Sequence, residues 1–145
     1  MNIAFFLTPK SEVVWIRARS TLRQAIERMR RNRYTAVPLL DDDGRYVGTL
    51  TEGDIMFHLL SVTEPLSAAA ESIRVTDIAR RMTNEPVRID AEVEALIALA
   101  IDQNFVPVVD DRGIFIGIVR RKPIIEHCAR LAGMIGEARS FSAAP

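Results

Sequence analysis

Two short stretches of the sequence combine polar or charged groups with the start of an expected helix. In the first, Thr51 and Asp54 stand three residues apart, where a strand-forming run gives way to a helical one. The start of a helix offers unpaired backbone N–H groups and the positive end of the helix dipole, and both favour phosphate. The Thr51 hydroxyl would then meet a phosphate oxygen. The same spacing is also typical of a helix cap, so both interpretations stay open.

The second stretch is Arg120-Arg121-Lys122, followed by Pro123, again where a strand gives way to a helix. Cations at the start of a helix oppose its dipole, at a cost of roughly a few tenths of a kcal/mol unless an anion intervenes. Arginine suits phosphate because its planar guanidinium can donate two parallel hydrogen bonds. Proline fits the first helical turn without strain. A solvated run of charge is the ordinary alternative, but the position favours phosphate binding.

The two stretches occupy equivalent positions in an internal repeat. Residues 37–48 return as residues 106–117 at an offset of 69, and residues 16–22 match 87–93 at an offset of 71. A repeat of this length predicts two similar structural units. The second unit has proline where the first has the carboxylate of Asp54.

Hydrophobic spacing predicts the same order of elements in both repeats. Residues 22–29 place apolar side chains at helical spacing, and Thr21 with Gln24 has the spacing of a capping box. The first repeat is expected to hold strands at 13–16, 36–41 and 46–50, and helices that begin at 22 and at 52. The second is expected to hold strands at 87–89, 105–110 and 115–119, a helix capped by Asp90 that runs to about Gln103, and a helix from about 122 to 131. The fold class is therefore α/β in the broad α+β sense, with two β-α-β-β-α units.

These elements divide the chain into four segments. They are residues 1–62, the first repeat with an N-terminal extension; residues 63–81, a linker with one or two helical turns; residues 82–132, the second repeat; and residues 133–145, a tail expected to fray. The expected helix at 93–101 is apolar nearly all round, which predicts that it packs against a partner face.

Composition narrows the classes of partner. The chain has 19 Lys and Arg residues against 19 Asp and Glu, and this zero net charge argues against nucleic acid as a partner. The single cysteine, Cys128, cannot form an internal disulfide, and no spacing of His and Cys suggests a metal. No stretch reaches the roughly 20 apolar residues of a membrane span. We therefore expect a cytoplasmic protein without a membrane partner.

With these features in place, the sequence resembles the CBS domain family from Leu7 to about Leu131. Gly48, Thr51 and Asp54 fit the family motif of Gly, two residues, Thr, two residues, Asp and an aliphatic residue. The resemblance implies two repeats packed sheet to sheet as a pseudo-twofold CBS pair, with two clefts between them, and a homodimer formed through helices. The sequence also resembles small stand-alone CBS proteins of Gram-positive bacteria, some of which bind cyclic di-AMP and others AMP.

The resemblance further implies that each cleft draws on both repeats and binds an adenine nucleotide. Asp54 would accept hydrogen bonds from ribose hydroxyls, and the basic stretch at 120–122 would bind phosphate. Adenine also needs an apolar slot beside free backbone polar groups. The residues expected to line the base slots are Val14, Tyr34, Thr35, Ala36, Pro38, Val87, Phe105, Val106 and Pro107. For Val87 and Val106, packing in the core is the competing interpretation.

The predicted function is a non-catalytic regulatory sensor. It would bind AMP, ADP, ATP or cyclic di-AMP, require no cofactor, and act in trans on an effector protein that the sequence does not identify. No nucleophile–base pair and no cluster of carboxylates can be placed, which argues against an enzyme. The alternative is a ligand-free structural or protein-interaction module, which Pro123 and the apolar helix at 93–101 favour.

Overall fold

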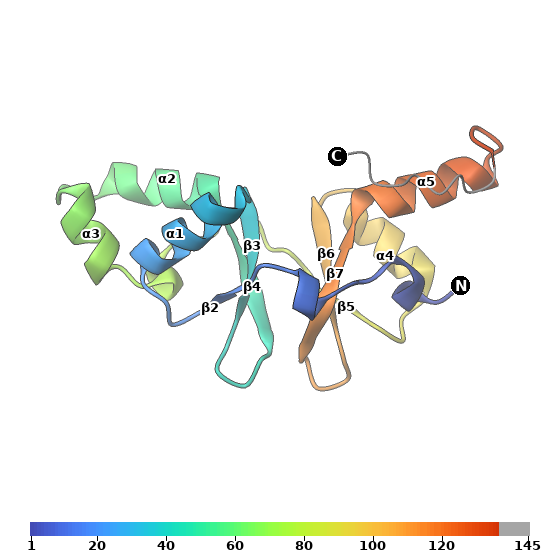
Figure 1. The fold of residues 1–145 in the computed structure, drawn as a ribbon, viewed down its shortest axis with the longest axis horizontal. Helices are drawn as coiled ribbons and strands as arrows, with labels where there is room; N and C mark the ends of the chain where they lie inside the picture. Colours follow the sequence, from blue (N-terminus) through green and yellow to red (C-terminus); the bar gives the residue numbers. More distant parts are fainter. Residues whose placement is uncertain (137–145) are drawn as a thin grey trace.

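The computed structural model describes residues 1–136, which form two similar halves that lie side by side with their sheets facing each other (Figure 1). The tail expected to fray at 133–145 lies largely outside the described residues. Within residues 1–136, no helix is long and apolar enough to span a membrane.

Each half has the predicted order of elements, so the β-α-β-β-α expectation is confirmed. The first half contains β2 (Ile16–Arg17), α1 (Leu22–Asn32), β3 (Ala36–Leu40), β4 (Tyr46–Thr51) and α2 (Glu52–Ser61). The second contains β5 (Val87–Arg88), α4 (Val93–Ala100), β6 (Phe105–Val109), β7 (Phe115–Arg120) and α5 (Arg121–Leu131). In both halves the first strand pairs parallel to the second, and the second and third strands form an antiparallel hairpin.

Three local expectations differ from the structure. The first strand covers Ile16–Arg17 and not 13–16, because the residues before Ile16 leave the sheet. Asp90 does not cap α4; its carboxylate pairs with Arg88, and Glu92 stands at the N-cap without a side-chain hydrogen bond. The helix ends at Ala100 and not near Gln103.

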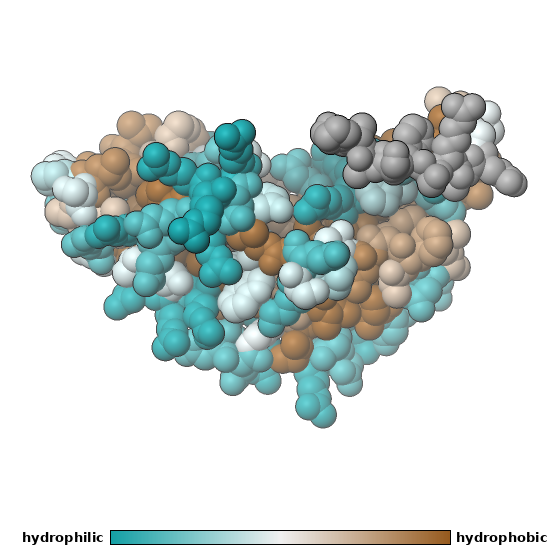
Figure 2. All heavy atoms as spheres, viewed as in Figure 1, coloured by the Kyte–Doolittle hydropathy of each residue, from teal (hydrophilic) through white to brown (hydrophobic). Residues whose placement is uncertain are grey.

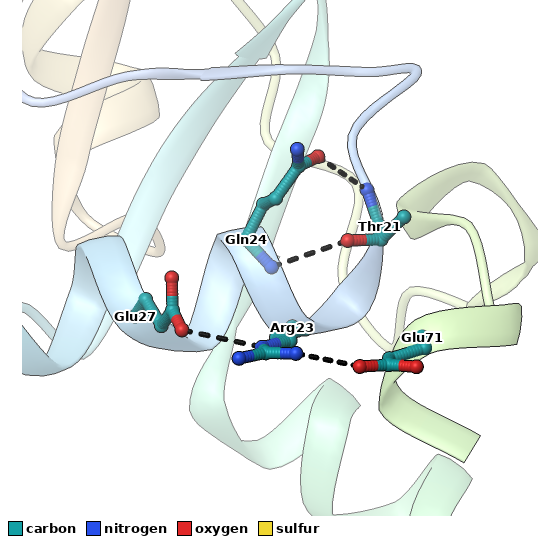
Figure 3. Close-up of polar contacts among 5 residues, drawn as sticks. All are labelled: Thr21, Arg23, Gln24, Glu27 and Glu71. Carbon is teal, nitrogen blue, oxygen red and sulfur yellow. Dashed lines mark hydrogen bonds and ion pairs between the residues drawn. The ribbon is translucent and has the colours of Figure 1, made fainter. Parts of the chain in front are cut away.

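The capping box expected at the start of α1 is present. The Thr21 hydroxyl accepts a hydrogen bond from the Gln24 backbone N–H at 3.3 Å, and the Gln24 side chain accepts one from the Thr21 N–H at 3.0 Å (Figure 3). Beside it, Arg23 joins Glu27 of α1 to Glu71 of α3 (Leu66–Ser72), the helix between the two repeats. The linker helix is therefore fastened to the first half.

Each hydrophobic core is completed by the segment that precedes the other half. Ile3 and Phe6 of η1 (Ile3–Phe6) are buried in the core of the second half. Val75 of η3 (Val75–Asp77) and Ile78, which follow the first half in the chain and precede the second, are buried in the core of the first. The N-terminal extension continues into β1 (Thr8–Pro9), which pairs antiparallel with β7. The chain therefore crosses between the halves twice.

The two halves are also joined where their sheets meet. Leu40 of β3 is buried together with Phe105, Phe115 and Ile118 of the second sheet. At the hairpin tips, the Tyr46 N–H donates to the Gly113 carbonyl at 3.2 Å and the Phe115 N–H donates to the Gly44 carbonyl at 3.0 Å. The sheets are thus fixed to each other by apolar packing and by backbone hydrogen bonds.

Gly117 allows the close approach of β1 to β7. A Cβ atom at this position would lie 2.2 Å from the backbone oxygen of Thr8, and only a shift of the backbone could relieve that contact. We expect Gly117→Ala to lower the free energy of unfolding by about 1–3 kcal/mol, measured by urea denaturation.

Gly53→Ala is the matched control, because the added methyl group would meet only the Thr51 hydroxyl oxygen, at 3.7 Å. Alanine is also the better helix former, so this variant should be as stable as the parent protein or slightly more stable. Equal stability of the two variants would show that β1 does not require the glycine.

Candidate functional site

A cleft of about 330 Å³ opens between the two halves. One wall comes from β3 and the segments around it, and the other from β6, β7 and the start of α5. The lining residues are Val13, Val14, Tyr34, Thr35, Ala36, Pro38, Asn104, Phe105, Ile118, Arg120, Arg121 and Lys122. The structure thus brings together the predicted residues Val14, Tyr34, Thr35, Ala36, Pro38, Phe105, Arg120, Arg121 and Lys122.

Three lining residues were not predicted from the sequence. Asn104 lies directly before β6 as Thr35 lies before β3, so the offset of 69 between the repeats could have identified it. Ile118 faces the cleft from the middle of β7. Val13 was assigned to a strand, whereas in the structure it stands outside the sheet beside Val14.

The basic end of the cleft coincides with the start of α5. Arg120 is the N-cap residue, and its side chain does not cap the first turn of the helix. The first-turn N–H groups of α5 therefore keep their positive partial charge without a capping acceptor from this residue. Arg120 and Lys122 are exposed, and within residues 1–136 neither side chain forms an ion pair or a hydrogen bond. This end of the cleft is therefore suited to an anion.

Arg121 differs from its two basic neighbours because its guanidinium already has partners. It donates to the backbone carbonyls of Ala100 at 2.9 Å, Gln103 at 2.8 Å and Ile101 at 3.1 Å. These carbonyls lie at and just beyond the C-terminus of α4, where a cation also interacts favourably with the helix dipole. Arg121 thus joins the end of α4 to the start of α5 and positions the basic end of the cleft.

Thr51 and Asp54 form the capping arrangement at the start of α2. The Thr51 hydroxyl accepts from the Asp54 N–H at 3.1 Å, and the Asp54 carboxylate accepts from the Thr51 N–H at 3.0 Å. The second carboxylate oxygen accepts from the Arg81 N–H at 3.0 Å, and Asp54 is only 3% exposed. Neither residue lines the cleft described above. The two helix starts are therefore unlike: that of α2 is capped and covered by the linker, and that of α5 is open.

The remaining predicted residues lie in the core of the second half. Val87, Val106 and Pro107 are buried and do not line the cleft, which agrees with the core-packing interpretation for Val87 and Val106.

A second hollow, of about 520 Å³, lies between β4 and residues 78–86. Its wall is built around Tyr46, whose hydroxyl is 2.7 Å from the Thr49 hydroxyl and donates to the Asn84 carbonyl at 2.8 Å. Burial raises the pKa of Tyr46 to about 12, so the hydroxyl stays protonated and remains a donor at neutral pH. Tyr46 therefore holds the segment around Asn84, which precedes β5, against β4.

The contacts of Arg121 predict a structural role that its basic neighbours do not share. Arg121→Ala should lower the free energy of unfolding by about 1–3 kcal/mol, because three carbonyl oxygens lose a charged donor. Arg120→Ala is the control and should change stability by less than about 0.5 kcal/mol. Thermal or urea unfolding of both variants measures the difference, and equal stabilities would contradict the assignment of Arg121 as a positioning residue.

Comparison with known proteins agrees with this architecture. The family model described as "CBS domain" matches residues 6–61 and again residues 62–130. The chain therefore belongs to the CBS domain family and carries two CBS domains. Proteins with a CBS pair are generally regulatory, non-catalytic modules. Within residues 1–136, no group of three or more His, Cys, Asp or Glu side chains could hold a metal ion. A search of curated proteins found no match to the chain.

Several solved structures share the fold. A CBS domain protein from Streptococcus pneumoniae is 26% identical, with a TM-score of 0.78 over 89% of this chain and 87% of that one. CbpB of Listeria monocytogenes, solved in complex with c-di-AMP, is 20% identical, with a TM-score of 0.78 over 92% and 98%. CBSX2, solved in complex with AMP, is 21% identical, with a TM-score of 0.70 over 90% and 98%. These structures include stand-alone CBS pairs, and they confirm the fold predicted from the repeat.

Proposed function

We propose that the protein is a cytoplasmic regulatory sensor that binds an adenine nucleotide in the cleft between its two CBS domains. The candidate ligands are AMP, ADP, ATP and cyclic di-AMP. The observation that carries the proposal is the open start of α5 at one end of an apolar cleft, with Arg120 and Lys122 exposed beside it. The structures of CbpB with c-di-AMP and of CBSX2 with AMP support the same chemistry by analogy.

The cleft offers suitable surroundings for each part of a nucleotide. Val14, Ala36 and Phe105 supply apolar surface for a flat base, and the small side chain of Ala36 lets a ring approach the backbone. Arg120 and Lys122 supply charged donors for phosphate, together with the first-turn N–H groups of α5. A volume of about 330 Å³ is at the lower end of the usual range for small-molecule sites, roughly 300–1,000 Å³. It suits one mononucleotide or one half of a dinucleotide.

We propose one ligand per chain, because the start of α2 is capped and the start of α5 is open. A nucleotide at the α2 end would have to displace the hydrogen bonds that the Asp54 carboxylate accepts from the backbone N–H groups of Thr51 and Arg81. At the α5 end the side chains of Arg120 and Lys122 form no hydrogen bonds within residues 1–136, so a nucleotide would have none of their bonds to break. The ribose role that the family resemblance implies for Asp54 therefore requires the linker to move first.

Calorimetry with AMP, ADP, ATP and cyclic di-AMP tests the proposal. We expect at least one of them to bind with about one ligand per chain. The double variant Arg120→Ala/Lys122→Ala should weaken that binding about tenfold or more, because each charge-assisted hydrogen bond contributes roughly 1.5–3 kcal/mol.

Arg30→Ala is the matched control, since Arg30 is exposed on α1 and does not line the cleft. Its nucleotide affinity should equal that of the parent protein. If protein freed of carried-over ligand binds none of the four nucleotides, the sensor proposal fails. The alternative function, a ligand-free protein-interaction module, would then hold. That alternative is favoured by one observation: Asp54 and Arg121 already have structural partners.

We further propose that the protein forms a homodimer through α2 and α5. These helices occupy equivalent positions in the two halves and run along the same edge of the molecule (Figure 1). Met56, Leu60, Ile125 and Leu131 are exposed on them, with Leu60 at 75%. Apolar side chains grouped on one edge are typical of an interface between protein chains.

The dimer is tested with charge on this edge. Leu60→Glu/Ile125→Glu should convert the dimer to a monomer, because an interface would have to bury two unpaired carboxylates from each chain. Val47→Glu places a carboxylate at an exposed apolar position of β4, away from α2 and α5, and should leave the dimer intact. Light scattering after size-exclusion chromatography measures the mass, and a parent protein that is monomeric would contradict the proposal.

We propose that nucleotide alters binding of an effector protein in trans. Such control needs a nucleotide affinity that differs between the conformations that bind the effector well and poorly.

A further inference from the structure

A third and larger hollow, a groove of about 1090 Å³, lies on the first half along β2 and α1. Arg17 and Arg19 line it from β2 and the loop that follows, and Arg28 and Arg31 line it from α1. Arg74, which precedes η3, closes one side. Figure 2 shows the hydrophilic residues that gather over α1 and its neighbours on this face. The groove therefore contains five guanidinium groups, of which that of Arg19 is paired with the Asp42 carboxylate at 3.1 Å.

The charge of the groove is strongly unbalanced although the chain as a whole is neutral. Glu27 is the one acidic residue in its lining, and its carboxylate is paired with Arg23, which is itself joined to Glu71 (Figure 3). Within residues 1–136, Arg17, Arg28 and Arg31 form no ion pair. Like charges held close together repel one another, and an acidic ligand would relieve that repulsion.

Trp15 lies at the centre of this charge and indicates which kind of anion fits. Lys10 Nζ lies 5.0 Å from the centre of the indole ring, and the guanidinium carbons of Arg17 and Arg28 lie 5.8 and 5.9 Å from it. Single-stranded nucleic acid binds such grooves by stacking bases on aromatic rings, but here cations already lie over the ring. The groove is also extended, because its arginines come from β2 and the loop after it, from α1 and from the residue before η3. Carboxylates on a segment of another protein match both features.

The groove and the nucleotide cleft share one stretch of backbone. Val14 lines both of them, Val13 lines the cleft, and Trp15 and Ile16 line the groove. Ile16 is buried in the core of the first half, and Val13 and Val14 stand outside the sheet. A ligand that displaces Val13 or Val14 therefore displaces the backbone that carries Trp15.

We infer that this groove is the surface on which an acidic segment of the effector protein docks, and that nucleotide in the cleft controls docking through residues 13–16. The control rests on the proposed function, whereas the docking surface does not. By linkage, a nucleotide that changes the affinity for the acidic segment by some factor must have its own affinity changed by the same factor.

The test uses the full-length protein and a short polyglutamate peptide, with an oligouridylate of equal charge as the competing probe. Trp15 is the single tryptophan of the chain, so its fluorescence reports on the groove directly. The peptide should change the emission and bind more tightly than the oligouridylate, with an affinity that falls as salt increases. Tighter binding of the oligouridylate would assign the groove to nucleic acid, and no binding of the peptide would overturn the docking surface.

Charge-reversal variants test whether the peptide binds in the groove. Arg28→Glu/Arg31→Glu should weaken peptide binding about tenfold or more, because both side chains line the groove. Arg30→Glu/Arg33→Glu makes the same change in net charge at the same end of α1 but outside the groove, and should have a much smaller effect. Equal losses in the two variants would show that the peptide responds only to overall charge, which contradicts a defined groove.

A final experiment measures whether the nucleotide changes the affinity of the groove for the peptide. A saturating concentration of whichever nucleotide binds by calorimetry should change the affinity for the peptide about fivefold or more. If the nucleotide and the peptide both bind without affecting each other, control through residues 13–16 is refuted while the cleft and the groove stand. If no nucleotide binds but the peptide does, the proposed sensor fails and the docking surface remains.

Discussion

The structure depends on an exchange of segments between its two halves. Each core includes side chains from outside its own repeat: Ile3 and Phe6 are buried in the core of the second half, and Val75 and Ile78 in that of the first. Removing either segment would expose apolar surface in the half that it covers. The exchange therefore makes the two CBS domains one cooperative unit and holds the cleft walls opposite each other. The dependence is physical, since small units bury too little apolar surface to be stable alone.

The two domains differ at the starts of their last helices, α2 and α5. At the start of α2, Thr51 and Asp54 satisfy the helix N-terminus and bind the linker. At the start of α5, Pro123 has replaced the carboxylate, and the cap is missing. An uncapped helix N-terminus is less stable by roughly 0.5–2 kcal/mol. In this protein the less stable arrangement is the one that faces the apolar cleft, where we propose that a nucleotide binds.

The sequence was a good guide to local structure and a poorer guide to contacts between distant residues. Periodicity in residues 22–29 and the spacing of Thr21 and Gln24 predicted α1 and its cap, because helical spacing and capping are local properties. The strand at 13–16 was wrong for most of its length, since its β-forming residues lie between two grooves and not in a sheet. The partners of Arg121 are backbone carbonyls, which leave no trace in the residue types. The role of η1 in the other half's core was equally invisible, because a few apolar residues fit many surfaces.

The paired hairpin tips have a mechanical consequence. Two backbone hydrogen bonds join the tips at one edge of the molecule, whereas α2 and α5 run along the opposite edge (Figure 1). Bonds of this kind resist separation of the tips but allow a small rotation about them. The tips then act as a hinge. The cleft lies at an intermediate distance from this hinge, and α2 and α5 lie farthest from it. A slight widening of the cleft would therefore appear as a larger displacement of α2 relative to α5.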